Sequence, residues 1–578
     1  MKYELINEVK YSSPLTQIFI NRGFKEEDID RYINISEKEL LSPTLLDNIA
    51  EGAKLIVSHL LNEDKIFIVV DSDADGYTSA SVLINYLLDL CPSSVNKISY
   101  GLHDGKEHGI ILDKIPEDVQ LVITPDSASN NIEEHRILRE RGVDVLVLDH
   151  HECDEVSPYA CIINNQTCDY PNKSLSGVGI VYKLCCLIDA ACGTDDASKY
   201  LDMVALGIIS DMMVVTNFEN RYIIKQGLEQ VKNPFFKAMC KKNEFKLGDK
   251  YNPLGISFYV TPYINAMVRS GTQEQKELMF KAMLNHEAER MIPSTKRGCK
   301  GEFETVVEQA VRTCANVKKH QDDAKKEQVT IIEKIIQENN LNENKILIIP
   351  LTEYIDKNLV GLIANQLMSK YQKPVILLNK YEDENGVRWS GSARSVNRSA
   401  IENLRGFVAD SGYAQFAEGH GAAFGTSFTE NGLSEFTEYS NNELKHMDFS
   451  PIYKVDFIFD GTTLNHHPLL EICDNLSPYW GQNFEESMIA IEKIKITRDN
   501  IELMAREKNP TLKIVLPSGV ELIKFGSSEE EYERLLPKPN QATYITAVGR
   551  CGKNEWMGRI KAQVSLEEYE INEIQYDF

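Results

Sequence analysis

The stretch from Lys65 to Tyr77, with the sequence KIFIVVDSDADGY, is the feature that most constrains this chain. An apolar run rich in β-branched residues ends in Asp71, Asp73 and Asp75, which alternate with small residues before Gly76. Residues two apart in an extended backbone point to the same side, so the three carboxylates can face one space. Ionised carboxylates that lie so near one another raise each other's pKa, unless cations are bound between them. The stretch therefore predicts a strand that ends at a metal site.

The same motif also occurs in two other contexts, which the neighbouring residues help to judge. D-x-D-x-D-G begins the calcium-binding loop of an EF-hand, in which the twelfth position is a glutamate and helices flank the loop. Here the twelfth position is Val82 and the preceding residues are β-branched, which argues against an EF-hand. A surface turn rich in aspartate is the other alternative, because turns favour this residue. The choice between a turn and a metal site depends on the rest of the chain.

Strand-like and helix-like segments alternate after Lys65. The strand-like segments are residues 66–70, 119–125 and 143–148, and the helix-like segments 79–90 and 130–142 separate them. Alternation of this kind predicts a parallel sheet that helices cover on both faces.

Acidic and imidazole side chains stand where these apolar runs end. They are Asp71, Asp126, Asp149, His150, His151 and Asp211, the last of which follows the run VALGIIS. Ligands of open α/β sheets bind beyond the carboxyl ends of the strands, so we expect these residues at one edge. Aspartates with an imidazole are typical ligands of magnesium or manganese, and their number suffices for two ions. Two such ions hold a phosphodiester and activate water for in-line attack, so the sequence predicts metal-dependent phosphodiester hydrolysis.

Several motifs along the chain resemble those of one protein family. DSDADG, Asp126, DHH at 149–151, SLSGVGIVYKL at 174–184 and ALGIISDM at 205–212 are similar to the successive motifs of the DHH phosphoesterase superfamily. VGLIANQLMSKYQKPVILL at 360–378, SGSARS at 390–395 and EGHGAAFG at 418–425 resemble the DHH-associated domain. SPYWGQNFEES and NEWMGRIKAQV resemble the C-terminal OB-type domain of RecJ proteins. The chain is similar to the RecJ single-strand-specific 5′→3′ DNA exonucleases over most of residues 42–570.

This resemblance implies two divalent cations, manganese or magnesium, and a ligand set for them. Asp73 and Asp75 would each hold one ion, and Asp126 would bridge the two. His150 and Asp211 would complete the second site.

The resemblance also implies roles for residues around these ligands. Asp149 would orient His150, as carboxylates do for metal-binding histidines. His151 would face the scissile phosphate, either as a phosphate ligand or as the proton donor to the leaving group. The family usually carries a histidine two residues before its first aspartate, where this chain has Val69. Asp71 or water would then take that ligand position.

A third set of residues is implied as substrate-binding. These candidates are His103, Lys106, His108, Arg394, Ser395, Gly419, His420, Gly421, Arg550 and Trp556. The first three lie in GLHDGKEHG (101–109), where ordinary loop polarity is an equally good explanation. Around Arg394, glycines let backbone amides approach a phosphate, and the guanidinium adds a fork of donors. Trp556 is either a stacking platform for bases or a buried plug of the C-terminal domain.

The order of segments predicts an α/β multidomain chain in five parts. Residues 1–60 form an N-terminal helical segment, 61–230 the DHH domain with its parallel sheet, and 231–343 a further helical segment. The last includes one long polar helix at 302–340, which would bridge to an α/β DHH-associated domain at 344–447. Short β segments within 448–578 predict an OB-type β-barrel.

The composition of the chain indicates its cellular compartment and the kinds of partner that it can bind. The net charge of −25 stands against a generic nucleic-acid binder, although a groove can be locally basic on an acidic protein. The 12 cysteines include no C-x-x-C pair, which indicates free thiols in a reducing compartment. No apolar run reaches the length of a membrane span, and the N-terminus lacks the apolar core of a signal peptide. We therefore expect a cytoplasmic protein without a membrane partner.

Taken with the resemblance, the sequence predicts a two-metal-dependent exonuclease that degrades single-stranded DNA from the 5′ end to mononucleotides. It would act in DNA recombination, repair or replication, with a single-strand-binding protein or a helicase as candidate partners. The polarity and the preference for DNA come from the resemblance alone. One alternative is a DHH phosphodiesterase on short oligonucleotides or cyclic dinucleotides. Another is a catalytically inactive DHH scaffold that binds DNA or replication partners.

Overall fold

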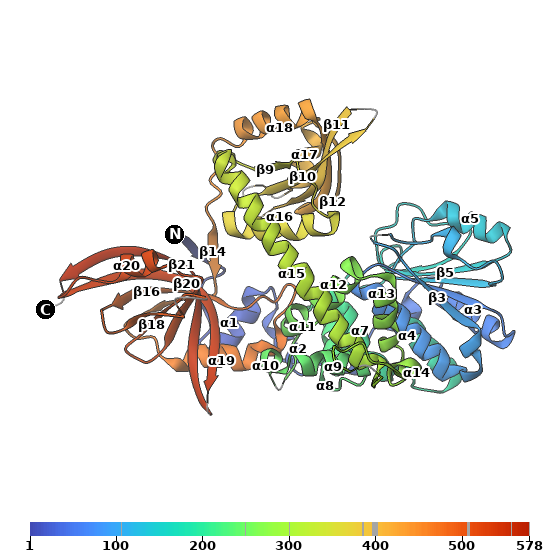
Figure 1. Cartoon of the computed structure of the whole chain (residues 1–578). Helices are drawn as coiled ribbons and strands as arrows, with labels where there is room; N and C mark the ends of the chain where they lie inside the picture. The colour runs from blue at the N-terminus through green and yellow to red at the C-terminus, as the bar shows by residue number, and fades with distance from the viewer. Residues whose placement is uncertain are drawn as a thin grey trace. The chain divides into compact units, whose positions relative to one another are not determined.

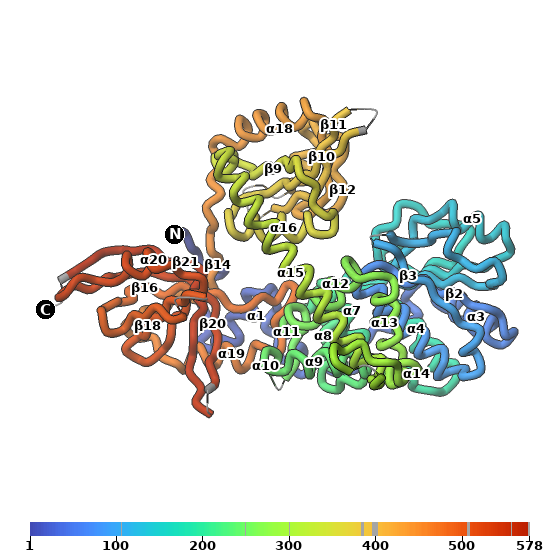
Figure 2. Tube along the Cα trace, viewed as in Figure 1, coloured from blue at the N-terminus to red at the C-terminus, as the bar shows by residue number. Residues whose placement is uncertain are grey.

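A computed structural model describes the chain except for residues 106, 249, 300, 384–385, 396–400, 402, 506–508, 557 and 577–578, and except for the side chains of residues 383, 556 and 576. The chain divides into two compact units, whose elements are labelled in Figure 1 and traced in Figure 2. Unit 2 comprises residues 22–318 and 474–486. Unit 1 comprises residues 1–21, 319–473 and 487–578. Each unit is described by itself.

Unit 2 is built on a five-stranded sheet with the order β3-β2-β4-β5-β6. The strands are β2 (Ile66–Val70), β3 (Ile98–Leu102), β4 (Leu121–Pro125), β5 (Asp144–Asp149) and β6 (Cys161–Asn164). All four neighbouring pairs are parallel. Every residue of β2 and β4 is buried, as expected for strands that helices cover on both faces. The parallel sheet predicted from the alternating segments is therefore confirmed.

Helices make up most of the remainder of unit 2. They are α2 (Glu26–Ile33), α3 (Ile49–Leu61), α4 (Ala74–Leu90), α5 (Ile132–Glu140), α6 (Gly177–Cys192), α7 (Leu201–Ser210), α8 (Phe218–Glu229), α9 (Pro234–Lys242), α10 (Glu244–Leu247), α11 (Pro253–Tyr259), α12 (Thr261–Ser270), α13 (Gln273–Met283) and α14 (Asn285–Ala288). A small hairpin, β7 (Met291–Pro293) and β8 (Phe303–Thr305), follows them. The apolar run before Asp211 forms α7 rather than a strand, so this aspartate follows the end of a helix.

A buried ion pair and its hydrogen bonds join four segments of unit 2. Lys183 of α6 pairs with Glu219 of α8, and the two side chains are 2% and 1% exposed. Glu219 also accepts hydrogen bonds from the Tyr170 hydroxyl at 3.0 Å and from the Asn172 amide at 3.1 Å. Lys183 Nζ donates to the carbonyl of Leu41 at 2.8 Å. A buried charge pair is tolerated when such additional hydrogen bonds satisfy it, so this network fixes α6, α8 and the N-terminal segment.

The first half of unit 1 is an α/β layer structure. Its five-stranded sheet has the order β12-β13-β11-β10-β9, in which only the β9–β10 pair is parallel. The strands are β9 (Leu347–Leu351), β10 (Val375–Asp383), β11 (Gly386–Arg394), β12 (Ala414–His420) and β13 (Ala423–Thr429), and the helices are α16 (Lys357–Tyr371), α17 (Leu404–Asp410) and α18 (Glu430–Glu443). The predicted long polar helix is α15 (Val306–Glu338), whose last 20 residues belong to this unit.

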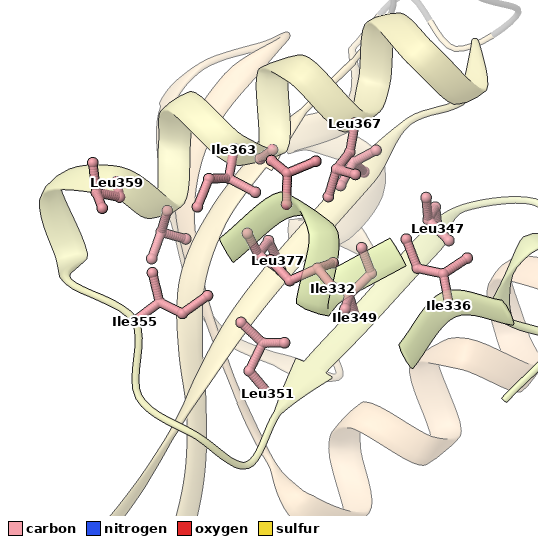
Figure 3. Close-up of a cluster of buried hydrophobic side chains, with 14 residues drawn as sticks. Ile332, Ile336, Leu347, Ile349, Leu351, Ile355, Leu359, Ile363, Leu367 and Leu377 are labelled. Carbon is pink, nitrogen blue, oxygen red and sulfur yellow. The ribbon is translucent and has the colours of Figure 1, made fainter. Parts of the chain in front are cut away.

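Alternation along the strands places two apolar cores on the two faces of this sheet. Leu347 and Ile349 of β9 face a core that includes Ile332 and Ile336 of α15 and Ile363 of α16, as Figure 3 shows. Ile346, directly before β9, and Ile348 within it face a second core, which α17 and α18 complete. Alternate residues of a strand point to opposite faces of the sheet, so every second residue of β9 packs on the end of α15. The end of α15 is therefore part of the core of unit 1.

The second half of unit 1 is a seven-stranded sheet with the order β15-β16-β20-β21-β19-β18-β17. Its strands are β15 (Phe457–Asp460), β16 (Met488–Ile496), β17 (Ile501–Met504), β18 (Thr511–Val515), β19 (Glu521–Phe525), β20 (Gln541–Trp556) and β21 (Arg559–Tyr576), and the helices α19 (His466–Leu476) and α20 (Glu529–Leu535) lie between them in sequence. The predicted C-terminal β domain is present. Among the described residues no pairing joins β15 to β17, so the sheet has two edges where a closed barrel has none.

The N-terminal segment differs from the helical expectation at its start. Lys2–Leu5 form a strand, β1, which pairs in parallel with β14 (Ile452–Val455), and α1 (Pro14–Asn21) follows. The first helix-forming residues lie beyond Ser13, and the exposed edge of β14 offers backbone partners to the preceding stretch. Residues 2–5 therefore form a strand because β14 pairs with them, whereas the helical expectation fits the residues beyond Ser13. No helix in the described part of the chain is both long enough and apolar enough to cross a membrane.

We predict that Lys183→Met lowers the free energy of unfolding of unit 2 by about 3–5 kcal/mol, because it leaves Glu219 as a buried charge without its cation. Urea denaturation of the full chain measures this change. The double variant Lys183→Met/Glu219→Gln removes both charges and is expected to recover part of the loss. A double variant less stable than Lys183→Met would contradict the importance of the charge pairing.

Candidate metal centre

The predicted site lies in unit 2, at the carboxyl edge of the parallel sheet. Asp71 follows β2, Asp126 follows β4, and Asp149 is the last residue of β5. Asp211 directly follows α7, which packs on α4. Residues separated by up to 140 positions in sequence therefore meet at one edge, as the sequence predicted from the ends of the strands.

The turn from β2 into α4 arranges the first three aspartates. Asp73 caps α4, and its carboxylate accepts a hydrogen bond from the Gly76 amide at 2.9 Å. A Cβ atom at Gly76 would lie 2.6 Å from the Cβ of Asp71, so only glycine lets the chain pass so close to this side chain. Asp71 is 2% exposed and Asp75 is 1% exposed. The turn thus buries two carboxylates and holds the third at a helix N-terminus.

Asp75 is held from the opposite side by the N-terminus of α6. Its carboxylate accepts hydrogen bonds from the Gly177 amide at 2.7 Å and from the Ser176 hydroxyl at 3.2 Å. A Cβ at Gly177 would lie 2.4 Å from Oδ1 of Asp126, so this glycine makes room for a second acid. Ser176 and Gly177 are not among the residues whose roles the sequence predicted. The signal was present in SLSGVGI, since a serine and glycines before an apolar helix are typical of an anion-holding N-terminus.

Asp126 is the carboxylate that most requires a cation. It is 1% exposed, and among the described residues neither of its oxygens accepts a hydrogen bond from a nitrogen or hydroxyl donor. Its φ of +69° is a left-handed conformation that aspartate tolerates better than most residues. Burial, together with the charges of Asp75 and Asp73, raises the pKa of Asp126 well above its ordinary value. A buried acid without donors is stable as a carboxylate only when positive charge is bound to it.

Two further groups share this environment with Asp126. His150 Nε2 lies 3.1 Å from Asp126 Oδ1 and 3.3 Å from Asp211 Oδ2. Burial lowers the pKa of His150 to about 4, so at neutral pH the imidazole has the neutral form that binds metals. Burial and the charges of Asp75 and Asp73 raise the pKa of Asp211 to about 8, and burial with the charge of Asp73 raises that of Asp75 to about 7.

The donor atoms form sets that fit divalent cations. Asp71, Asp73 and Asp126 offer oxygens that all lie within 4.8 Å of one another, and so do the ligand atoms of Asp75, His150 and Asp211. Carboxylate oxygens with one imidazole suit magnesium or manganese. Because Asp126 Oδ1 is also 3.1 Å from His150 Nε2, this carboxylate reaches both sets. The unpartnered oxygens of Asp126 and the raised pKa values show that the residues fit bound cations.

Asp149 contacts both histidines that follow it, in different ways. Its carboxylate accepts a hydrogen bond from the His150 backbone amide at 2.7 Å and is 2.8 Å from His151 Nδ1. Burial alone would raise the pKa of Asp149, but the bonds from His151 and Ser129 outweigh it and lower the pKa below its ordinary value. The same bond to Asp149 raises the pKa of His151 to about 9. The ring held by Asp149 is thus that of His151, and His150 is held through its backbone.

The loop after β3 brings two of the candidate substrate contacts to Asp71. His108 Nδ1 lies 2.8 Å from Asp71 Oδ2, and the Gly109 amide donates to Asp71 Oδ1 at 3.2 Å. His103 is 4% exposed, and its Nε2 lies 3.6 Å from Asp71 Oδ1. Burial lowers the pKa of His103, whereas the bond to Asp71 raises that of His108. Lys106, the third candidate of this loop, lies outside the described residues.

The remaining candidates belong to unit 1. Arg394 on β11 and His420 on β12 both stand at the level of Ala423 on the strand between them, and the Ser395 amide donates to Ala422 at 2.8 Å. Gly419 has φ of +127°, and the Gly421 carbonyl accepts from the Arg405 amide at 3.0 Å. The structure therefore gathers Arg394, Ser395, Gly419, His420 and Gly421 at one end of the five-stranded sheet. Arg550 on β20 donates to Glu567 at 2.8 Å, and the side chain of Trp556 lies outside the described part.

We predict that Asp126→Asn stabilises the metal-free protein at pH 8. A carboxyl whose pKa is raised on folding costs stability as pH rises above its unfolded value near 4, and asparagine removes that cost while tolerating the left-handed backbone. The gain in Tm should reach several degrees, since about 1 kcal/mol shifts Tm by about 2–4 °C in large domains, and should shrink towards pH 5.

Thermal unfolding in EDTA and in manganese, at pH 5 and pH 8, measures this effect. Manganese is expected to raise the Tm of the original chain more at pH 8, because the ligands must lose their protons, and to stabilise Asp126→Asn much less. Asp113→Asn, at an exposed site, is the control and should follow the unchanged chain. An Asp126→Asn variant that gains as much from manganese as the control would exclude Asp126 as a ligand.

The family and the relatives that this chain matches agree with the metal site described above. Residues 65–208 match the model of the DHH family, N-terminal domain. The chain is 36% identical over 575 residues to YorK of Bacillus subtilis strain 168, a protein of SPbeta prophage origin whose provisional name is single-strand DNA-specific exonuclease. The alignment covers 99% of this chain and 98% of YorK. The single-stranded-DNA-specific exonuclease RecJ of B. subtilis is 24% identical over 608 residues, which cover 99% of this chain and 70% of RecJ.

The fold agrees with that of a solved RecJ structure. RecJ of Thermus thermophilus in complex with Mn²⁺ superposes with a TM-score of 0.72 at 19% identity, covering 99% of this chain and 80% of that one. The match to YorK over 99% of this chain, the DHH motifs and the clustered acids at the edge of the sheet lead to one assignment. The chain belongs to the RecJ-like family of the DHH phosphoesterase superfamily.

Proposed function

We propose that this protein is a manganese- or magnesium-dependent exonuclease that hydrolyses single-stranded DNA from its 5′ end to mononucleotides. The observation that carries the proposal is Asp126, a buried carboxylate without donors that stands between two sets of metal-ligating atoms. The names of YorK and RecJ as single-strand DNA-specific exonucleases support the substrate, and the manganese complex of Thermus RecJ supports the cation.

The two ligand sets divide the work of binding cations. Asp71, Asp73 and Asp126 would hold one ion, and Asp75, His150 and Asp211 would hold the second. Asp126 would contribute to both sites, because its Oδ1 also lies 3.1 Å from His150 Nε2. Bound divalent cations supply positive charge that polarises the phosphodiester and lowers the pKa of water. His108 and the Gly109 amide fix the Asp71 carboxylate, so Asp71 takes the position that Val69 cannot fill.

His151 is the proton donor in this mechanism. Its Nδ1 is held by Asp149, and the side chain is 57% exposed, so the ring is both oriented and accessible to substrate. Because its pKa is raised to about 9, the imidazole is cationic at neutral pH and can protonate the leaving oxygen or bind the phosphate. Asp149, whose pKa is lowered, stays ionised and keeps the proton on the ring.

Several residues of unit 1 bind the phosphate backbone of the substrate strand. Arg394, Ser395 and the backbone around Gly419 and Gly421 bind a phosphate, since a guanidinium beside glycine-rich backbone at one end of a sheet suits that anion. The C-terminal sheet adds a surface for the strand, with Arg550 as one contact. The enzyme acts in the cytoplasm in DNA recombination, repair or replication, on single strands that a helicase or a single-strand-binding protein presents.

We predict that the chain releases labelled mononucleotide from 5′-labelled single-stranded DNA in manganese, and that His151→Gln lowers kcat by about 10²–10⁴-fold because general acid catalysis is lost. A time course on denaturing gels measures both. His467→Gln, at an exposed histidine of unit 1, is the matched control. Binding of DNA without cleavage would instead indicate a scaffold, and cleavage confined to dinucleotides would indicate a short-substrate phosphodiesterase.

We predict that Asp71→Asn weakens manganese binding by at least tenfold, and that His108→Gln weakens it less because it only frees the Asp71 carboxylate. Electron paramagnetic resonance of free manganese in titrations of the protein measures the affinity without turnover. Full affinity and activity in Asp71→Asn would show that water, not Asp71, fills the place left by Val69.

A further inference from the structure

A line of exposed apolar side chains in unit 2 begins directly beside the metal centre. Met212 follows Asp211, is 53% exposed and has φ of +55°. This left-handed conformation is uncommon for a residue other than glycine, and such strain is kept mostly where a specific geometry is needed. The backbone at this point places the Met212 thioether at the surface next to a predicted metal ligand.

The line continues on α11, which packs on α7. The Ser257 hydroxyl donates to the sulfur of Met212 at 3.7 Å, and the next residue, Phe258, is 62% exposed. The buried Ile256 and a 3.0 Å bond from the Leu254 amide to the Trp480 carbonyl anchor this helix. Phe258 is therefore an exposed ring on a fixed element close to the metal centre.

The line ends on α10, which packs on α11 beside it, as Figure 1 shows. Lys246 Nζ lies 5.2 Å from the centroid of the Tyr259 ring, a distance at which a cation is attracted to an aromatic face. The neighbouring Phe245 is 97% exposed, more than any other large apolar side chain among the described residues. Single exposed apolar residues are common, but Met212, Phe258 and Phe245 lie on elements that follow one another in space from Asp211.

Positive charge accompanies these rings. Residues 237–250 contain five lysines and two acids, whereas the whole chain has 62 basic and 87 acidic residues. Lys241, Lys242 and Lys246 are exposed. On an acidic protein this segment is therefore a locally cationic surface with aromatic rings in it.

We propose that Met212, Phe258 and Phe245, with Lys246 and its neighbouring lysines, form a track that binds single-stranded DNA beside the metal centre. The inference rests on the proposed function, because it names how that substrate is held. Rings stack on bases of any sequence, and lysines neutralise the phosphates between them. A protein partner would favour a contiguous apolar patch, whereas here cations are interspersed with the rings.

Binding without turnover tests the track. Fluorescence anisotropy with labelled dT20 in EDTA gives the Kd of the full chain and of its variants. Phe245→Ala and Phe258→Ala should each weaken binding about tenfold, and Phe245→Tyr should keep the affinity within about twofold because a stacking ring remains. Lys246→Gln should reduce the slope of log Kd against log salt by about one. Leu61→Ala, which alters a 79% exposed residue before the amino end of β2, is the matched control.

Cleavage in manganese separates this inference from the function on which it rests. Phe245→Ala should raise KM for long single strands, yet cleave the dinucleotide pdTdT as the unchanged chain does, because in this proposal α10 binds bases beyond the two nearest the metal centre. If the unchanged chain cleaves single strands while Phe245→Ala and Phe258→Ala bind dT20 normally, the track is refuted, the proposed function stands, and the patch is left to a protein partner. If the unchanged chain neither binds nor cleaves DNA, both proposals fail.

Discussion

Mutual repulsion among buried carboxylates is the constraint on which the site depends. Asp75 and Asp126 are each 1% exposed, and burial together with the charges of Asp75 and Asp73 raises the pKa of Asp211 to about 8. Without a cation, the protein can keep these acids together only by protonating some of them. A bound cation attracts each carboxylate and relieves their mutual repulsion. The arrangement of the acids therefore favours the binding of divalent metals at this edge of the sheet.

The rest of unit 2 holds these acids against that repulsion. Gly76 and Gly177 remove the atoms that would keep Asp71 and Asp126 away from neighbouring backbone. The N-terminus of α6 partly offsets the charge of Asp75 with backbone amides. Further from the site, the Lys183–Glu219 pair fixes α6 in place, because a buried charge pair with satisfied hydrogen bonds tolerates little displacement. The favourable interactions in the core of unit 2 thus offset the repulsion among the carboxylates at the edge of the sheet.

The chain also resolves an apparent conflict between its charge and its proposed substrate. A net charge of −25 opposes DNA binding at a distance, but part of that charge belongs to the metal centre and is neutralised when cations bind. Local composition then matters more than the total, as the lysines of residues 237–250 illustrate. Specificity for single strands would follow from exposed rings such as Phe245 and Phe258, since bases in a duplex are already stacked.

The sequence by itself determined the parallel sheet and named most of the candidate metal ligands. Buried parallel strands have continuous apolar runs, and ligands cluster where such runs end, so Asp71, Asp126 and Asp149 could be placed without coordinates. It could not determine β1, because a four-residue strand forms only when the edge of β14 is beside it. Nor could it give the openness of the C-terminal sheet, which depends on pairings between distant strands. Tertiary structure alone decided that Asp149 holds the ring of His151, that His108 holds Asp71, and that Ser176 and Gly177 face Asp75. Those contacts join residues from separate loops, and their directions depend on packing that no local pattern in the sequence records.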